Sequence, residues 1–189
     1  MDIIQQVFND LNSELIIKIN DAATTKFLGK GTYFLKEGQV NKHMAVVNSG
    51  ILQSYFYKDG KEITTYLAGP GKIVVSLSSY LNQMPSKEYI KALVDTELIL
   101  IHKTDIDKLI DQDETFRLYY IKTLEYQITC IDESRFDFIT LSAEERYIKL
   151  LSDEPYILQQ VPLKYIAATL GITERQLTRI RKKIIKRKI

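Results

Sequence analysis

Basic side chains recur at helical spacing near the C-terminal end of the chain. Residues 174–189 contain eight Lys and Arg residues against the single Glu174, whereas residues 1–173 hold 18 basic and 23 acidic residues. An arginine guanidinium can make two hydrogen bonds to a guanine edge, and a lysine ammonium can neutralise a phosphate. An acidic body with a basic end therefore indicates a polyanionic partner at this end, nucleic acid before membrane.

These basic residues lie on a predicted amphipathic helix. Thr173 can cap its first turn, because Gln176 follows three residues later. Leu177, Ile180 and Ile184 form an apolar face, and the basic residues fall on another. The helix is therefore expected to bury one side against the protein and to present the other to a ligand.

A second, shorter helix is predicted over residues 163–170, immediately before Gly171. Gly171 can adopt the left-handed conformation that ends a helix, and Ala167 is small enough to let the next helix cross close above it. Two helices joined by a turn of about three residues form a helix-turn-helix, which lays the start of its second helix into the major groove of DNA. The sequence therefore predicts a DNA-binding end.

Short strands are predicted across the N-terminal half. Seven of the eight glycines lie between Gly29 and Gly71. They separate runs rich in aromatic, Thr and Val residues at 32–35, 44–47, 51–57, 63–67 and 73–75, and a closing strand is predicted over 97–102. Asp59-Gly60 suits a tight hairpin turn, and this pattern predicts an antiparallel sandwich or barrel. Short N-terminal helices are predicted before it from the spacing of Ile3, Val7, Leu11 and Leu15.

One long helix is predicted between these halves, roughly from Glu114 to Phe136. Four apolar residues fall on one seam of this helix: Ile121, Leu124, Ile128 and Ile131. The pattern alone leaves two interpretations open, packing within its own domain or joining two chains. Residues 138–141 are predicted to break the helix, and Ser142 with Glu145 has the spacing of a capping box for the next one.

In its whole plan the chain resembles the Crp/Fnr-type transcription regulators, from about Thr24 to Ile184. The most specific stretch, LKYIAATLGITERQLTRIRKKI, is similar to the family pattern Leu-Ala-x-x-Leu-Gly-Ser/Thr-x-x-x-x-x-Arg. The resemblance implies an α+β fold with an N-terminal antiparallel β-roll (a cyclic-nucleotide-binding-like jelly roll), a long dimerisation helix and a C-terminal winged helix-turn-helix. These parts would occupy residues 1–112, 113–137 and 138–189.

The resemblance also implies roles for individual residues. Base edges would be contacted by Glu174, Arg175 and Arg179, and the long helix would be the dimer helix, with the seam as its interface. Phosphates would be contacted by Thr173, Thr178, Lys182, Lys183 and Lys186. The wing is expected to be minimal, with residues 157–161 as one strand, because little chain remains after Lys186.

The cyclic-nucleotide signature of the family is missing. Its members place Gly-Glu, and about ten residues later Arg-Ser or Arg-Thr followed by Ala, around the ribose and phosphate. This chain has Val75-Ser76 and Ser86-Lys87-Glu88 at those positions. Lys87 lacks the planar fork of Arg, and Glu88 would repel a phosphate. An effector other than cyclic AMP, or none, is therefore expected at a pocket built from Ser76, Ser78, Ser79, Ser86 and Lys87.

No cofactor, metal site or enzymatic centre is expected. Cys130 is the only cysteine, and His43 and His102 are far apart in sequence, so no metal cluster is predicted. Cys130 is interpreted as a small core residue. No apolar run reaches the ~20 residues of a membrane span. The first residues lack the plan of a signal peptide, so the cytoplasm is the expected location.

We therefore expect a homodimeric regulator that binds palindromic double-stranded DNA, with an unknown small-molecule effector and RNA polymerase as a further partner to consider. Two alternatives stay open. One is a genuine cyclic-nucleotide-responsive regulator. The other is a β-roll interaction module whose basic end binds nucleic acid without specificity.

Overall fold

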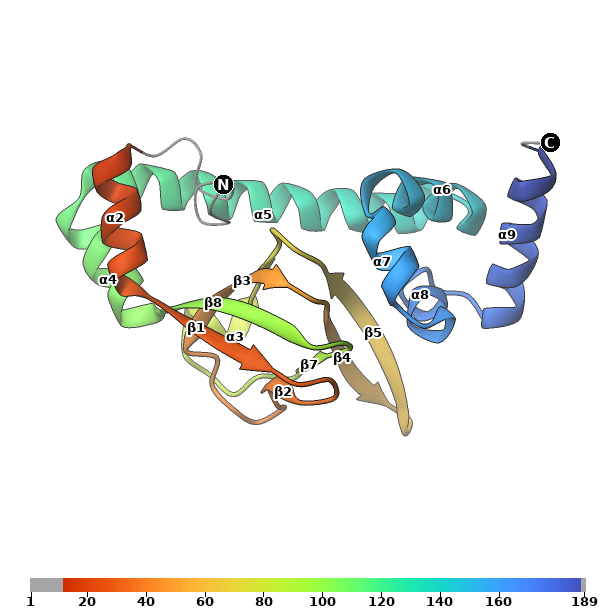
Figure 1. The fold of residues 1–189 in the computed structure, drawn as a ribbon, viewed down its shortest axis with the longest axis horizontal. Coiled ribbons are helices and arrows are strands. Elements are labelled where there is room, and N and C mark those ends of the chain that lie inside the picture. The colour runs from red at the N-terminus through yellow and green to blue at the C-terminus, as the bar shows by residue number, and fades with distance from the viewer. Residues whose placement is uncertain (1–11, 188–189) are drawn as a thin grey trace.

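The structure, a computed structural model, describes residues 12–187. Two antiparallel sheets form a β-roll, a long helix lies across it, and short helices follow at the far end (Figure 1). This arrangement confirms the α+β fold and the order of its parts that the sequence predicted. Ile3, Val7 and Leu11 of the predicted N-terminal helices lie outside the described residues.

The β-roll consists of two four-stranded sheets. One has the order β1 (Ala23–Leu28), β8 (Thr96–His102), β3 (His43–Ser49) and β6 (Ile73–Val74). The other has the order β2 (Tyr33–Leu35), β7 (Tyr89–Ala92), β4 (Leu52–Lys58) and β5 (Lys61–Ala68). Apolar side chains from both sheets meet in one core, which includes Val47, Leu52, Ile90, Leu98 and Leu100.

Six of the eight strands follow runs predicted from the sequence. Asp59 and Gly60 both have positive φ, 51° and 73°, as a tight hairpin turn between β4 and β5 requires. β1 and β7 were missed. Four of the six residues of β1 are exposed, and the strand exists because it pairs with β8, which is distant in sequence.

Helices cover the outer side of the first sheet at one end of the molecule. α2 (Ser13–Ala22) begins after Asn12, whose Oδ1 accepts a hydrogen bond from the Leu15 amide at 2.9 Å. Along the chain, α4 (Lys103–Gln112) follows β8 directly, and α3 (Leu77–Asn82) comes after β6 and before β7. With the start of the long helix, α2 and α4 enclose a second apolar core that includes Ile19, Ile101, Ile106 and Phe116.

The long helix, α5, spans Glu114–Thr140, and Asp113 caps it by accepting a hydrogen bond from the Phe116 amide at 3.1 Å. Phe116 is the buried residue of this 27-residue helix. The break predicted at Phe138 was wrong, because the helix continues to Thr140. The centre of the Phe138 ring lies 4.5 Å from the guanidinium carbon of Arg146, and this contact holds the last turn of α5. The spacing of apolar residues in the sequence does not indicate such a contact.

Four shorter helices complete the chain: α6 (Ala143–Asp153), α7 (Pro155–Gln160), α8 (Leu163–Thr169) and α9 (Glu174–Arg187). The capping box of Ser142 and Glu145 forms as predicted. The prediction of a wing strand over 157–161 was wrong, because most of that segment belongs to α7. Pro155 favours the helix, since its missing N–H costs nothing in the first turn. Within residues 12–187 no strand follows His102, so the wing has no counterpart there.

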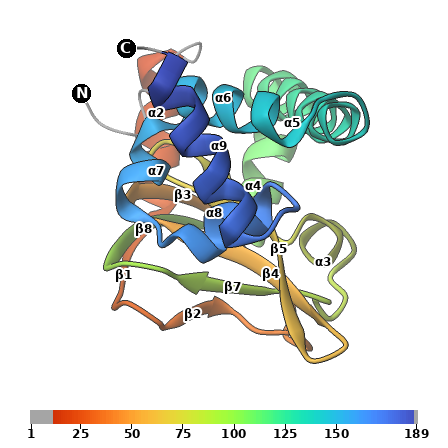
Figure 2. The same cartoon turned by 90° about the vertical axis from the view of Figure 1, so that its right-hand side faces the viewer.

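α7 and α8 pack against the outer side of the second sheet. Ile51, Leu67 and Leu93 of the roll share one apolar cluster with Ile157 and Ile166. Figure 2, which views the molecule from this end, shows α9 in front of α8 and away from the roll. The roll and the terminal helices thus form one continuous body, a contact that the sequence did not predict.

Gly171 provides a test of how tightly this end is packed. Its φ is +68°, and a Cβ at this position would lie 3.0 Å from the Phe138 ring. Gly38 has a similar φ of +82°, with nothing within 4 Å of its Cβ position. Gly38→Ala should therefore cost about 1 kcal/mol for the conformation alone. Gly171→Ala should cost roughly 1 kcal/mol more for the crowding. Urea unfolding measures both, and equal losses would contradict tight packing at Gly171.

Candidate nucleic-acid interface

The helix-turn-helix consists of α8, a turn at Gly171 and α9. The predicted cap forms, because the Thr173 amide donates to Gln176 Oε1 at 2.8 Å and the Gln176 amide donates to Thr173 Oγ1 at 3.3 Å. Ala167 and Leu177 are buried where the two helices meet, as predicted. The turn, the cap and the apolar lock therefore hold α9 in a defined place on α8.

Arg146 of α6 fixes this motif to the end of α5. Its guanidinium donates to the Leu141 carbonyl at 2.5 Å and to the Leu170 carbonyl at 3.0 Å. These carbonyls lie at the ends of α5 and α8, where backbone acceptors lack partners within the helix. One side chain thus joins three helices. The sequence analysis missed Arg146, since a single Arg in an amphipathic helix carries no signal of its own.

The residues predicted to contact base edges, Glu174, Arg175 and Arg179, are all exposed on α9. Those predicted to contact phosphates are also exposed: Thr173, Thr178, Lys182, Lys183 and Lys186. Lys183 is ion-paired, with its Nζ 2.5 Å from Glu144 Oε2 of α6. No such pair within residues 12–187 involves Arg175, Arg179 or Lys182. Their charges therefore remain available to a ligand, whereas that of Lys183 is partly neutralised.

A hollow of about 580 Å³ lies between α6 and α9. Its walls include Arg179, Lys182, Lys183 and Lys186, and among the described residues that line it Glu144 is the single acidic one. A concave surface with this charge suits a phosphate backbone that follows α9. The basic residues on one side of α9 and the residues predicted to contact base edges at its start therefore form one surface.

The predicted seam on α5 is largely open. Ile121, Ile128 and Ile131 are 46%, 63% and 56% exposed, and Leu124 is half-buried. Further exposed apolar side chains continue along the helix at Leu118, Tyr126, Phe136 and Ile139. An apolar surface of this length on a charged protein is typical of an interface rather than of a free face.

Three of the five residues predicted for an effector pocket come together, but they bind one another. Ser76, Ser79 and Ser86 are buried, with the Ser76 and Ser86 hydroxyls 3.0 Å apart. Asn41 joins them, since its Oδ1 accepts from the Ser76 backbone amide at 3.0 Å and its own backbone amide donates to Ser79 Oγ at 2.9 Å. Lys87 and Ser78 are exposed and do not take part. The polar groups at this place are thus already satisfied within the protein.

Glu88 makes the same place acidic. Burial raises the pKa of the Glu88 carboxyl, and a hydrogen bond with the Ser76 side chain opposes that rise only in part. A half-buried carboxylate beside the two serines would repel a phosphate group. The location that holds the nucleotide phosphate in the family's cyclic-nucleotide-binding members is therefore neutral or negative in this chain.

The two histidines, far apart in sequence, are partners in the pairing of β3 with β8, and their ring centres are 4.9 Å apart. His102 Nδ1 caps α4 by accepting a hydrogen bond from the Thr104 amide at 3.2 Å. Burial, with a smaller contribution from the neighbouring Lys26 and Lys42, lowers the pKa of His43. Within residues 12–187 no group of three metal-ligating side chains occurs. Cys130, predicted as a core residue, is half-buried on α5.

Comparison with known proteins adds to this description. Residues 25–113 match the family profile of the cyclic nucleotide-binding domain. FixK2 from Bradyrhizobium japonicum has a TM-score of 0.75 at 16% identity, over 88% of this chain and 86% of that one. A structure from Eubacterium rectale, assigned to the Crp/Fnr family of transcriptional regulators, has a TM-score of 0.67 at 22% identity, over 98% and 89%. This chain has the Crp/Fnr architecture. The resemblance indicated by the sequence motifs is confirmed at that level.

A curated protein to which the chain is similar is the anaerobic regulatory protein of Bacillus subtilis, 22% identical over 130 residues. The match takes in 68% of this chain and 55% of the relative, so the chain spans little more than half of that protein's length. None of the helices within residues 12–187 has the length and apolar character to cross a bilayer.

The half-buried carboxyl of Glu88 predicts a pH-dependent stability. Because its pKa is raised in the folded state, the ionised form costs stability above that pKa, and the cost vanishes below the unfolded value of about 4.3. Glu88→Gln should therefore raise the melting temperature at neutral pH and leave it unchanged at about pH 4. Glu125→Gln removes the same charge from an exposed position and serves as the control. A stabilisation that is equal at both pH values would contradict this account.

Proposed function

We propose that this chain is a homodimeric transcription regulator of the Crp/Fnr type that binds specific double-stranded DNA. The exposed, capped start of α9, with Arg175 and Arg179 open to a ligand, is the observation that carries the proposal. Arg side chains at the start of such a helix can read guanine in the major groove. Such a role also places the protein in the compartment that holds DNA, the cytoplasm.

The basic hollow beside α9 supports a second set of contacts. Lys182 and Lys186 lie on its wall and are exposed, which suits phosphates on either side of the base-reading helix. Lys183 contributes less, because Glu144 already neutralises it. This arrangement favours binding to a specific DNA sequence over non-specific binding of nucleic acid by a basic tail. The charges lie on a helix that is fixed in place, and the residues proposed to contact bases lie apart from them at its start.

The open seam on α5 supports a dimer. Two copies of the chain can cover Ile121, Leu124, Ile128 and Ile131 by pairing their long helices about a two-fold axis. A symmetric dimer presents two α9 helices to successive major grooves and so requires a palindromic site. RNA polymerase and a small-molecule effector remain further proposed partners.

Cyclic AMP is not favoured as that effector. The Ser76–Ser86 hydrogen bond and the carboxyl of Glu88 occupy the place of the Glu and Arg that the family's cyclic-nucleotide-binding members use. Among residues 12–186 no guanidinium acts on Glu88 at this place that could neutralise a buried phosphate, and an unpaired buried charge costs several kcal/mol. The match to the cyclic nucleotide-binding domain therefore supports the fold of the roll and not its usual ligand.

The first test separates base reading from phosphate binding. Arg179→Ala should cost about 1–3 kcal/mol on the preferred duplex and little on random DNA. Lys182→Ala should weaken both duplexes about equally and lower the salt slope by roughly one. Lys183→Ala should lower that slope by less. Fluorescence anisotropy on a duplex selected from a random pool measures all three variants. Equal losses on specific and random DNA for Arg179→Ala would refute base reading.

The second test addresses the dimer. Ile128→Glu places a charge in the seam of each copy, twice across the proposed two-fold axis, and should produce a monomer. Half-sites lie about 34 Å apart in this binding mode, so the monomer should lose most of its affinity for the palindrome. Thr129→Glu adds the same charge beside the seam and should remain dimeric. Sedimentation velocity checks both variants, and a monomeric wild type that binds one half-site tightly would contradict the dimer.

A further inference from the structure

Four tyrosines form a cluster on the outer face of the second sheet, contributed by β2, β4 and β7: Tyr33, Tyr55, Tyr57 and Tyr89. Tyr55 and Tyr89 are partners across neighbouring strands, and their rings are stacked with centres 5.2 Å apart and an interplanar angle of 14°. The ring centre of Tyr33 lies 5.9 Å from that of Tyr89, and the Tyr33 and Tyr55 hydroxyls are 3.2 Å apart. The rings therefore form one continuous aromatic surface.

Tyr57 is the most open member of this cluster. Its ring is nearly perpendicular to the rings of Tyr55 and Tyr89, at 86° and 80°, and the residue is 49% exposed. Tyr55, by contrast, is fully buried among its neighbours. An aromatic side chain that is already held by other rings loses little freedom when a flat ligand stacks on it. The cluster thus provides a stacking surface that is arranged in advance.

Lysine side chains alternate with these rings. Lys36 Nζ lies 5.0 Å from the ring centre of Tyr33, and Lys91 Nζ lies 4.8 Å from that of Tyr55. Lys36 is exposed, and within residues 12–187 it forms no ion pair. Lys91 Nζ is 3.5 Å from a carboxylate oxygen of Glu62. Positive charges beside aromatic rings suit a ligand that carries both flat rings and anionic groups, which is the composition of a nucleic-acid strand.

The same surface continues onto α8, the first helix of the helix-turn-helix. The Tyr165 ring centre lies 6.0 Å from Lys91 Nζ and 4.6 Å from Lys164 Nζ. Lys91 therefore stands between a ring of the roll and a ring of α8. Three lysines contact the rings, whereas two carboxylates border them, that of Glu62 and that of Glu37, which is hydrogen-bonded to the Tyr89 side chain. Together the rings form a tyrosine track, defined by Tyr33, Tyr55, Tyr57, Tyr89 and Tyr165.

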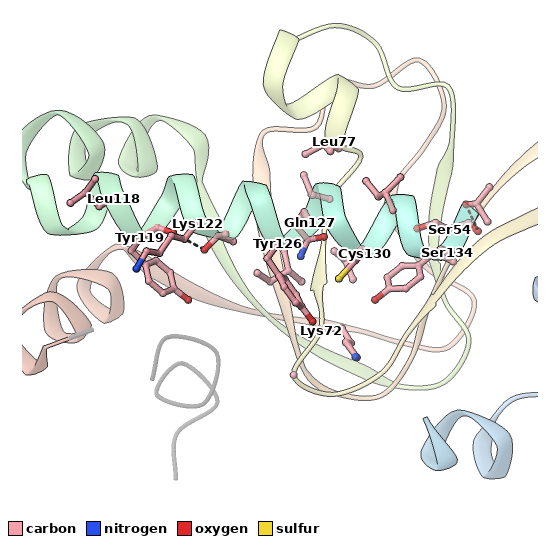
Figure 3. Close-up of a pocket in the computed structure, with 18 of the residues that line it drawn as sticks. Ser54, Lys72, Leu77, Leu118, Tyr119, Lys122, Tyr126, Gln127, Cys130 and Ser134 are labelled. Carbon is pink, nitrogen blue, oxygen red and sulfur yellow. Dashed lines mark hydrogen bonds between the residues drawn. The ribbon is translucent and has the colours of Figure 1, made fainter. Parts of the chain in front are cut away.

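The track is separate from the other candidate surfaces. A cavity of about 1160 Å³ lies between the β-roll and α5, with Tyr126 and Cys130 on its wall (Figure 3). None of the described residues that line this cavity, or the basic hollow beside α9, belongs to the track. The hairpin of β4 and β5, which carries Tyr57, extends beyond the terminal helices (Figure 1). A ligand can therefore occupy the track without entering the cavity or the hollow.

We propose that the tyrosine track binds single-stranded DNA, with bases stacked on the rings and phosphates facing the lysines. Every base has a flat face that a tyrosine can stack on, so no sequence preference is expected. A duplex does not suit the track, because its bases already stack on one another. Continuity with α8, which crosses the DNA backbone in this class of motif, favours DNA over RNA as the source of the strand. That choice of source rests on the proposed function, whereas the binding itself rests on the track alone.

Two strands with the same phosphates test the stacking. One is an oligothymidylate of about ten nucleotides, and the other is an abasic oligonucleotide of the same length. By fluorescence anisotropy, the wild type should bind the oligothymidylate much more tightly. Tyr57→Leu keeps an apolar side chain but removes the ring, and should weaken oligothymidylate binding about tenfold. Tyr57→Phe keeps the ring and should retain the affinity. Neither substitution should change binding of the abasic strand.

The charges beside the rings have a different signature. Lys36→Gln should weaken both strands and lower the salt slope by about 0.7. Glu62→Gln should tighten both strands severalfold, because it frees Lys91 from its carboxylate partner. Tyr156 of α7 and Lys42 before β3 are exposed and lie outside the track. Tyr156→Ala and Lys42→Gln serve as matched controls and should leave both affinities unchanged.

Four results would overturn the proposal. One is equal affinity for the oligothymidylate and the abasic strand. Another is an oligothymidylate affinity that responds to Arg179→Ala and not to Tyr57→Leu, which would place the strand on α9. A third is binding of a proline-rich peptide in place of the oligothymidylate, which would make the track a polypeptide surface. The last is tighter binding of oligouridylate, which would assign the track to RNA. Lys36→Gln and Glu62→Gln keep the test valid if Tyr57→Leu fails to fold.

Binding of the selected duplex separates this proposal from the proposed function. Tyr57→Leu should leave the affinity for that duplex unchanged, and Arg179→Ala should leave the affinity for the oligothymidylate unchanged. If strand binding fails while Arg179→Ala still loses specific duplex binding, only the track proposal is wrong. If strand binding succeeds while no duplex is preferred, the proposed function is wrong and the track stands as a binding site.

Discussion

The orientation of α9 depends on one joint, at which the guanidinium of Arg146 joins the ends of α5 and α8. The two carbonyls that it binds, of Leu141 and Leu170, would otherwise be left without partners at helix ends. The Phe138 ring covers the guanidinium, and Gly171 leaves room for that ring. Nε of Arg146 is buried without a partner, a cost that the cation–π contact and the two carbonyl bonds offset. Each part of the joint therefore requires the others, which makes it a discrete arrangement rather than a flexible hinge.

Local features of the sequence predicted the local structure well. The caps at Ser142 and Thr173, the Asp59-Gly60 turn and the left-handed Gly171 all depend on residues within four positions of one another. β1 and the Arg146 joint could not be predicted in this way. β1 exists through pairing with β8, whose partner residues lie 68 to 78 positions further along the chain. The supposed wing strand over 157–161 shows the opposite error, since its apolar residues serve a helix buried against the roll.

The predicted effector residues illustrate what a resemblance conveys and what it does not. The departure from the cyclic-nucleotide signature was visible in the sequence, because Ser76 and Ser86 stand where Glu and Arg are expected. What fills the place of those longer side chains was not visible. Asn41, which comes from a loop before β3, supplies the missing hydrogen bonds and turns a ligand site into an internal one. The β-roll is thus retained, while Asn41, a residue outside the signature, satisfies polar groups that would otherwise be free to bind a ligand.

The long helix carries two surfaces, and this explains why its pattern was ambiguous. Ile121, Leu124 and Ile128 lie on the seam, whereas Thr123, Tyr126 and Cys130 face the cavity. Ile131 belongs to both sets. A helix with adjacent apolar stripes is not sharply divided into buried and exposed sides, so its periodicity cannot show which stripe meets another chain. Because both stripes belong to one rigid element that ends at the Arg146 joint, a rotation of α5 that opens the cavity must also turn the seam and move the point where α8 is held. The cavity, the seam and the hold on α8 are therefore linked through one helix.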